Sequence, residues 1–296
     1  MKKNAVNLFF MGKGGTGKST CSALKSLKLA IDGKKVLLVS LDPAHNLSDI
    51  FEKSFSEKPR NIDANLQVKE IDLEKRMRKN LTRTENQISR SYTYLSAFNL
   101  QQHFKILKYA PSMEEYALLN AYSDIRKSFA RNKDYIVFDM PPTALALRFF
   151  ALPALSLIWL KKLLELRSQI LENKKILTRL KFAGKELETD RILLNINQQI
   201  THYEKLRAEF AERQQTRIKL VLNPERLSIN ESLLIYNRLR EFDLTVHQLI
   251  LNKVRDQKTE PLLADFPDTN IQRIYFTSNK LIGITNLRTY LQQHTM

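Results

Sequence analysis

The chain has 296 residues, 43% of them hydrophobic, with a single cysteine and a formal net charge of +17 at pH 7. This length and hydrophobic content suffice for one large α/β domain with an insertion. One cysteine excludes a disulfide framework, and no signal peptide precedes the first apolar segment, so we expect a cytoplasmic protein in a reducing compartment. The longest apolar run, residues 149–160, contains Pro153 and is expected to be too short to span a membrane.

A glycine-rich loop follows the first predicted strand. Residues 6–11 form an apolar run typical of a buried strand, and residues 22–31 predict a helix. Between them, residues 12–20 read Gly-Lys-Gly-Gly-Thr-Gly-Lys-Ser-Thr. Glycines let backbone N–H groups turn toward a phosphate, and the helix N-terminus adds partial positive charge. This order of strand, loop and helix predicts a phosphate-binding loop, and a glycine turn without a ligand is the less favoured alternative.

The side chains of the loop indicate which ligands it binds. Lys18 is expected to reach the β- and γ-phosphates of a nucleotide, and the Ser19 hydroxyl is expected to hold Mg²⁺. The other residues expected to surround the phosphates are Gly14, Gly15, Thr16, Gly17 and Thr20. The loop therefore predicts a nucleotide phosphate and Mg²⁺ as its ligands.

A second lysine, Lys13, stands at the start of the loop. The pattern Lys-Gly-Gly-x-Gly-Lys-Ser resembles the deviant phosphate loop of the dimeric ATPases related to nitrogenase iron protein and to the Min and Par proteins. The resemblance implies that Lys13 crosses to the phosphates of a partner subunit and neutralises charge in the transition state. It therefore implies a homodimer that must close in order to hydrolyse ATP.

A second strand is predicted at residues 35–40, and residues 41–49 then read Leu-Asp-Pro-Ala-His-Asn-Leu-Ser-Asp. Ligands gather at the carboxyl ends of parallel strands, so Asp42 is expected beside the phosphates. There it could orient the attacking water or accept its proton. The alternative role for such an aspartate, capping the next helix, suits Asp49 better.

A further strand at residues 135–138 ends at Asp139, which is expected to contact Mg²⁺ through water and to sense the γ-phosphate. The prolines at 141 and 142 then predict a switch-like turn. Strands are also predicted at residues 246–251 and 274–276, and a C-terminal helix is predicted from about residue 284.

The loop and residues 41–49 together are similar to the arsenical pump-driving ATPase family, which includes the eukaryotic targeting factor for tail-anchored membrane proteins. Further similar segments follow in chain order at residues 65–72, 134–139, 142–143, 147–149, 221–228 and 249–252. The resemblance implies an α/β P-loop NTPase domain over residues 1–296, with a mostly parallel central sheet and an inserted helical subdomain. It also implies that Asn252 lies against the adenine and that Glu231 lies near the nucleotide across the dimer. At residues 144–146, Ala-Leu-Ala replaces the Gly-His-Thr of the family.

Two insertions, at about residues 75–133 and 150–215, are predicted to be helical and to form the subdomain. The second carries a stripe at three- and four-residue steps, composed of Leu152, Leu155, Trp159, Leu163, Leu166 and Ile170, and a second apolar face with Leu157, Leu160 and Leu164. A helix that is apolar on two sides is either deeply buried or faces another molecule. In the targeting factors the matching insertions form a groove for a membrane helix, so the resemblance implies a hydrophobic helical client. Ordinary packed helices are an equal alternative.

Three uses of the ATPase stay open. The first is targeting or chaperoning of apolar helices, and the second is energising an anion pump through a peripheral membrane or membrane-protein partner. The third is positioning or partitioning, with DNA or anionic membrane bound to basic faces. Only charge supports the third use, since residues 75–133 carry 12 Lys and Arg against 4 Asp and Glu, so nucleic acid is the less favoured partner. Residues 253–273 contain no cysteine, so we expect no zinc site, and Cys21 alone predicts no thiolate site for arsenite.

Overall fold

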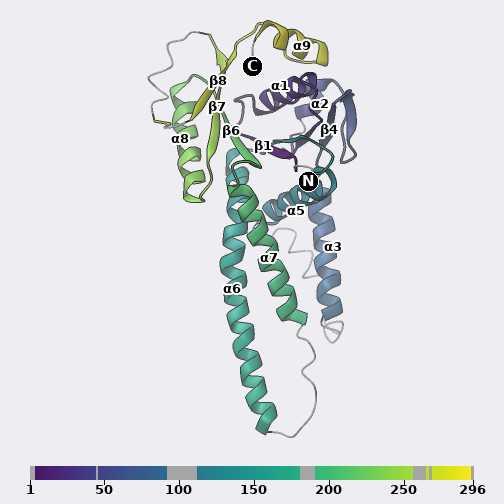
Figure 1. Ribbon diagram of the computed structural model, residues 1–296, viewed down its shortest axis with the longest axis vertical. Helices are drawn as coiled ribbons and strands as arrows, with labels where there is room; N and C mark the ends of the chain where they lie inside the picture. Colours follow the sequence, from purple (N-terminus) through teal and green to yellow (C-terminus); the bar gives the residue numbers. More distant parts are fainter. Residues whose placement is uncertain are drawn as a thin grey trace.

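The computed structural model describes residues 4–44, 46–91, 112–180, 191–255, 265–266 and 269–294. Within these ranges the chain forms an eight-stranded sheet in the order β3-β4-β2-β5-β1-β6-β7-β8, with helices on both faces (Figure 1). All neighbouring strands pair in parallel except β3 and β4, which are antiparallel. The predicted α/β class with a mostly parallel sheet is confirmed.

The strands are β1 (Val6–Met11), β2 (Val36–Ser40), β3 (Arg60–Asp63), β4 (Leu66–Glu70), β5 (Tyr135–Asp139), β6 (Thr216–Leu222), β7 (Val246–Val254) and β8 (Asn270–Tyr275). Five of them coincide with strand predictions, although β8 begins four residues earlier than predicted, and β4 lies within the similar segment at residues 65–72, which the resemblance implies is a strand. The strands β3 and β6 were not predicted. β3 is a short polar edge strand, and β6 places Arg217 and Lys219 between its apolar residues, so neither has the apolar run of a central parallel strand.

The helices are α1 (Lys18–Ile31), α2 (Asn46–Phe51), α3 (Leu73–Ser91), α5 (Met113–Phe129), α6 (Thr143–Leu180), α7 (Arg191–Ala211), α8 (Arg226–Glu241) and α9 (Ile284–Gln293). The first helix begins at Lys18, four residues before the predicted start, so Gly17 is its N-cap. Both insertions are helical where the structure describes them. Residues 92–111 of the first, residues 181–190 of the second, and His45 lie outside the described residues.

Two apolar layers hold the sheet. On one face, α1 packs against β1 and β2, and α9 packs against α1, with Leu24, Leu27 and Leu287 fully buried. On the other face, α5 and the start of α6 cover an aromatic cluster made of Phe9, Tyr122, Phe138, Phe149 and Phe210. With both faces covered, only the ends of the strands are open to a ligand, as is usual for parallel sheets.

Helix α6 is the longest element, with 38 residues, and it runs with α7 away from the sheet (Figure 1). It continues through Pro153, because the residues around that proline, including Phe149, Phe150 and Leu157, are packed in the core. The expectation that the apolar run is too short for a membrane is therefore wrong on length. The segment Thr143–Glu172 is long enough to cross a membrane, and its most apolar 18-residue window has a mean hydropathy of 1.8. The mostly buried core helix of a soluble protein passes the same test of length and composition.

The two apolar faces of α6 differ in burial. Leu157 on the second face is buried and Leu160 packs against the core. On the first stripe, Leu152 packs against the core, but Trp159 is 72% exposed. The exposed apolar residues of α6 are Leu155, Ile158, Trp159, Leu163, Leu166 and Ile170, and we call them the α6 stripe. In the described part of the chain, the first face of α6 is therefore largely unpacked.

Candidate nucleotide site

The loop between β1 and α1 has a backbone that depends on glycine. Gly12 has a φ of +150°, and a Cβ there would lie 2.2 Å from the Val221 carbonyl oxygen. Gly17 has a φ of +90°, and a Cβ there would lie 2.3 Å from the Asn252 side-chain nitrogen. A side chain at either position would therefore push the loop away from β6 or β7, which explains why the loop needs these glycines.

Interactions within the phosphate loop position the Lys18 side chain beside the loop backbone. The Thr16 hydroxyl donates to the Lys13 carbonyl oxygen at 2.8 Å, and the Lys18 ammonium lies 3.4 Å from the same oxygen. The side chains of Lys18 and Thr16 are buried. A carbonyl is a weak partner for a buried ammonium, and an anion such as a phosphate would be a much stronger one.

Asp139 supports the predicted Mg²⁺ site. It ends β5 and is fully buried, and neither of its carboxylate oxygens has a hydrogen-bond partner in the described residues. Burial raises the pKa of Asp139 to about 7, although the nearby Ser19 hydroxyl and Lys18 ammonium act to lower it. An unpartnered buried carboxylate beside a hydroxyl is a donor set that fits a hard cation with its bound water. The described residues contain no group of three or more His, Cys, Asp or Glu that could hold a metal alone, so phosphate oxygens would have to complete this site.

Asp42 lies at the carboxyl end of β2, as the strand rule predicts. Its carboxylate accepts a hydrogen bond from the Ala44 backbone N–H at 3.0 Å, and its own N–H donates to the Ser40 hydroxyl at 3.2 Å. The side chain is 94% buried by neighbours but lines the same pocket as Lys18 and Ser19. One oxygen is thus oriented by the turn, and the carboxylate is positioned where it could contact a water beside a phosphate.

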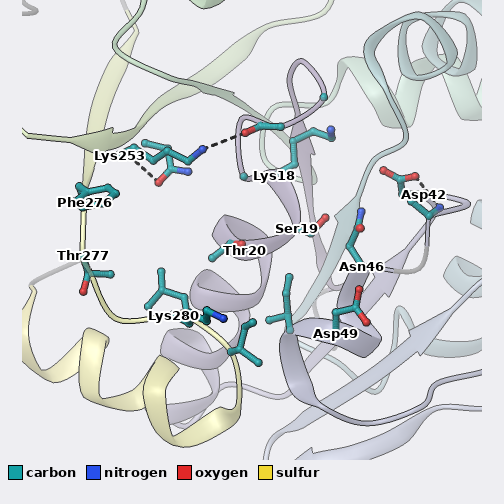
Figure 2. A pocket seen from close by; sticks show the side chains of 18 of the residues that line it. Lys18, Ser19, Thr20, Asp42, Asn46, Asp49, Lys253, Phe276, Thr277 and Lys280 are labelled. Carbon is teal, nitrogen blue, oxygen red and sulfur yellow. Dashed lines mark hydrogen bonds between the residues drawn. The ribbon is translucent and has the colours of Figure 1, made fainter.

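A pocket of about 820 Å³ opens above the loop (Figure 2). The predicted residues that line it are Gly14, Gly15, Gly17, Lys18, Ser19, Thr20, Asp42 and Asn252. Thr16, Lys13, Asp139 and Glu231 are not part of its lining. The structure therefore brings most of the predicted site into one cavity at the carboxyl edge of the sheet, with Asp139 buried beneath it.

One wall of this pocket was not predicted. The end of β8 and the segment after it contribute Tyr275, Phe276, Thr277 and Lys280, and Figure 2 shows these last three on the opposite side of α1 from Asp42 and Asn46. Tyr275 and Phe276 are 41% and 47% exposed; Tyr275 stacks on His294 and the Arg255 guanidinium lies 4.1 Å from the centre of the Phe276 ring, so part of each ring is left for a ligand. The polar residues that directly follow the last predicted strand were the available signal, because ligands gather at such strand ends.

Asn252 contacts the loop itself. Its side-chain nitrogen donates to the Thr16 carbonyl oxygen at 2.8 Å, and its side-chain oxygen accepts from the Lys253 N–H at 2.9 Å. The Lys253 ammonium lies 3.4 Å from the Gly15 carbonyl oxygen, as the dashed line in Figure 2 shows. Asn252 therefore ties β7 to the phosphate loop, in addition to lining the pocket where the resemblance places an adenine.

Lys13 points away from the pocket in the single chain. Its ammonium is 2.8 Å from the Glu231 carboxylate, and both side chains are more than one-third exposed. The ion pair connects the start of the phosphate loop to α8, which packs on the face of the sheet opposite α1. Lys13 therefore does not contribute charge to the pocket of its own chain in this conformation.

Comparison with known proteins gives a family. Residues 6–275 match the sequence model of the anion-transporting ATPases. The chain is 31% identical over 252 residues to "Putative arsenical pump-driving ATPase 2" of Aquifex aeolicus, which covers 83% of this chain and 79% of that protein. It is 31% identical over 296 residues to the ATPase ASNA1 homolog of Plasmodium vivax (93% and 73%), and 29% identical over 252 residues to ATPase GET3A of Arabidopsis thaliana (83% and 66%). With a phosphate loop of this geometry and similarity along most of its length, the chain belongs to the anion-transporting ATPase family and is an ATP-hydrolysing enzyme.

Proposed function

We propose that this ATPase is a cytoplasmic homodimer that closes on Mg²⁺-ATP and uses closing and opening to bind and release an apolar helix of a client protein. In this proposal the helices of residues 75–133 and 150–215 form the client-binding subdomain. The observation that carries it is the α6 stripe, because six large apolar side chains on one helix face are exposed to water. Exposed apolar surfaces of this kind commonly mark binding sites.

The proposed chemistry follows from the pocket. Lys18 and the backbone N–H groups of residues 14–17 bind the phosphates, and the adenine lies between Asn252 and the wall at Phe276. When bound, Mg²⁺ neutralises phosphate charge, and Ser19 and Asp139 are the residues that would hold it. Asp42 positions the attacking water.

Dimerisation supplies the remaining charge in this proposal. Lys13 exchanges its contact with Glu231 for the phosphates of the partner subunit, where it stabilises negative charge in the transition state. The exposed Lys13–Glu231 pair is easily exchanged, since such surface ion pairs contribute only about 0–1 kcal/mol. Hydrolysis therefore depends on the approach of the second chain.

Tryptophan fluorescence tests the client proposal directly. Trp159 is the only tryptophan of the chain and lies in the α6 stripe. A synthetic 20-residue apolar helix is titrated into the protein in Mg²⁺-ATP and, separately, in Mg²⁺-ADP. We expect a blue shift of the Trp159 emission that saturates and differs between the two nucleotides. An emission that stays unchanged with the apolar helix in both nucleotides would overturn the proposal.

Two variants make the test specific. Leu163→Gln changes a half-exposed residue of the stripe and is expected to weaken peptide binding severalfold. Ile31→Gln is the matched control, because Ile31 is similarly exposed but lies at the end of α1. Equal effects of the two variants would contradict a binding site on α6. ATP turnover without peptide should be the same in both.

The names of the relatives also favour an anion-pump energiser as a second candidate. The arsenical pump-driving relative points to this use, whereas the one cysteine does not favour arsenite as the activator. Cys21 is fully buried and burial raises its pKa, so it is a thiol rather than a thiolate ligand. An oxyanion pump therefore predicts ATPase stimulation by an anion that requires no cysteine, which can be measured as turnover against added oxyanions.

A further inference from the structure

A second pocket lies at the opposite edge of the sheet from the nucleotide pocket. It has a volume of about 450 Å³ and is lined by the amino-terminal halves of β1, β6 and β7 together with α1. We call it the amino-edge pocket, and its charged or polar side chains include Lys25, Arg213, Arg217, Lys219, His247 and Gln248. No carboxylate is among its lining residues in the described part of the chain.

The cations of this pocket are arranged from rim to floor. Arg213 and Arg217 are exposed, Lys25 is half-buried, and Lys219 is 93% buried. Lys219 donates to the side-chain oxygen of Gln248 and lies 5.9 Å from the centre of the Phe10 ring. None of these four cations forms an ion pair with a residue that the structure describes. A buried ammonium without a counter-ion is unusual, because buried charges are normally paired.

A neighbouring recess extends the same positive surface. This pocket of about 610 Å³ shares Tyr135, Arg213 and Arg217 with the first and adds Lys34. Its one carboxylate is that of Asp134, which accepts a hydrogen bond from the backbone N–H of Lys35 at 2.7 Å. Because its lining holds three cations (Lys34, Arg213 and Arg217) and one carboxylate, this recess keeps a net positive charge.

The electrostatics of the floor favour an anion. Burial, together with the nearby charges of Lys25 and Arg217, lowers the pKa of Lys219 to about 7. The backbone N–H of Ile218 donates to Nδ1 of His247, so Nε2 carries the proton of the neutral ring. That Nε2 atom is buried and has no hydrogen-bond partner among the described residues. The pocket thus presents cations that have no carboxylate partner among its described lining residues.

We propose that the amino-edge pocket binds a small anion with at least two negative charges on phosphate groups, of the pyrophosphate or phosphate-ester class. Guanidinium groups at the rim suit the oxygens of a phosphate, and the buried lysine supplies a point charge at the floor. A floor that is nine-tenths buried favours a small ligand that enters the pocket over the phosphates of a membrane surface or a duplex, which stay outside. The site is separate from the nucleotide pocket and does not rest on the proposed function.

Site-resolved lysine labelling tests this proposal on the unaltered protein. Inorganic pyrophosphate is added without nucleotide, and the rate of acetylation at each lysine is followed by mass spectrometry at pH 7.5, so that Lys18 reports binding in the nucleotide pocket and Lys219 reports binding in the amino-edge pocket. A bound anion stabilises the ammonium form, so a rise of one or two units in the pKa of Lys219 slows its labelling about tenfold. Lys28 is the internal control. It lies on α1, as Lys25 does, but outside the pocket, and it pairs with Asp32 at 2.6 Å. Equal rates with and without pyrophosphate at Lys219 would overturn the proposal.

A pair of variants adds an affinity measurement. Lys219→Met retains the length and apolar stem of the side chain, and Lys28→Met is the matched control. By calorimetry on a Lys18→Ala background, which lacks phosphate binding at the nucleotide pocket, we expect pyrophosphate to bind Lys219→Met at least about tenfold more weakly than Lys28→Met, as expected when a central charge contact is lost. Similar affinities would contradict the site. Protection of Lys219 by anionic vesicles or duplex DNA, but not by pyrophosphate, would overturn the small-ligand assignment.

Discussion

The nucleotide pocket and helix α6 differ from an ordinary protein interior and surface in opposite ways. The pocket buries polar side chains, and the helix exposes apolar ones. Around the phosphate loop, Lys18, Asp42 and Asp139 are buried although they are polar. Along α6, large apolar side chains such as Trp159 are exposed. Each arrangement costs free energy in the isolated chain, and each is offset when a second molecule binds there. In the proposed function a second molecule completes both regions, and it is charged in the first case and apolar in the second.

The largest effect is expected at Lys13. It tests whether one chain alone supplies all the positive charge that ATP hydrolysis needs. Lys13→Ala should lower ATP turnover by about 10³-fold, the lower end of the range for a cation supplied in trans. Because Lys18→Ala lacks phosphate binding but retains Lys13, an equimolar mixture of the two inactive variants should regain turnover. Turnover is measured by phosphate release. A mixture that stays inactive after subunit exchange would show that Lys13 acts within its own chain.

The next largest effect is expected at Asp42, the buried carboxylate that is proposed to position the attacking water. Asp42→Asn should lower turnover by about 10²-fold, as expected for loss of a group that orients or deprotonates water. ATP affinity, measured by calorimetry, should change little. The Ala44 N–H can still bond the amide oxygen, so the turn is retained. Loss of ATP binding together with turnover would place Asp42 in ground-state binding instead.

A smaller effect separates the two faces of α6. Leu157 is buried, so Leu157→Ala should lower the free energy of unfolding by about 2–3 kcal/mol. Trp159 is two positions away and 72% exposed, so Trp159→Ala should change it by no more than about 0.5 kcal/mol. Urea unfolding of both variants measures the difference. Equal losses would mean that the stripe is packed in solution.

The smallest expected effect is a dependence of stability on pH. Asp139 has its pKa raised to about 7 from the ordinary 3.8, so between these values the folded chain binds a proton that the unfolded chain releases. Its burial therefore costs least near pH 4, and the cost grows up to about pH 7. Asp139→Asn should stabilise the nucleotide-free protein by about 1–2 kcal/mol at pH 8 and less at pH 5, measured by urea unfolding. The reverse dependence would contradict an unpaired carboxylate.

The sequence predicted the central fold and much of the site, because both rest on local patterns. Apolar runs mark the buried parallel strands, and Asp42 and Asp139 stand where two of these strands end. The wall at Phe276 was missed, since no local pattern shows that the end of β8 lies opposite the loop. The burial of α6 was also not predictable, because periodicity identifies two apolar faces but not which one meets the core. Contacts such as Lys13 with Glu231 join residues more than 200 positions apart and require the fold.

The continuity of α6 has a mechanical consequence. The helix begins one residue after Pro142, which lines the nucleotide pocket, and it runs unbroken through Pro153 to Leu180. At about 1.5 Å per residue its 38 residues form a rod roughly 57 Å long. A tilt of about 5° at the base of such a rod moves its far end by roughly 5 Å, close to the pitch of one helical turn. If the proposed closing on ATP tilts this helix at its base beside the nucleotide pocket, the helix therefore multiplies that tilt into a much larger displacement of its far end.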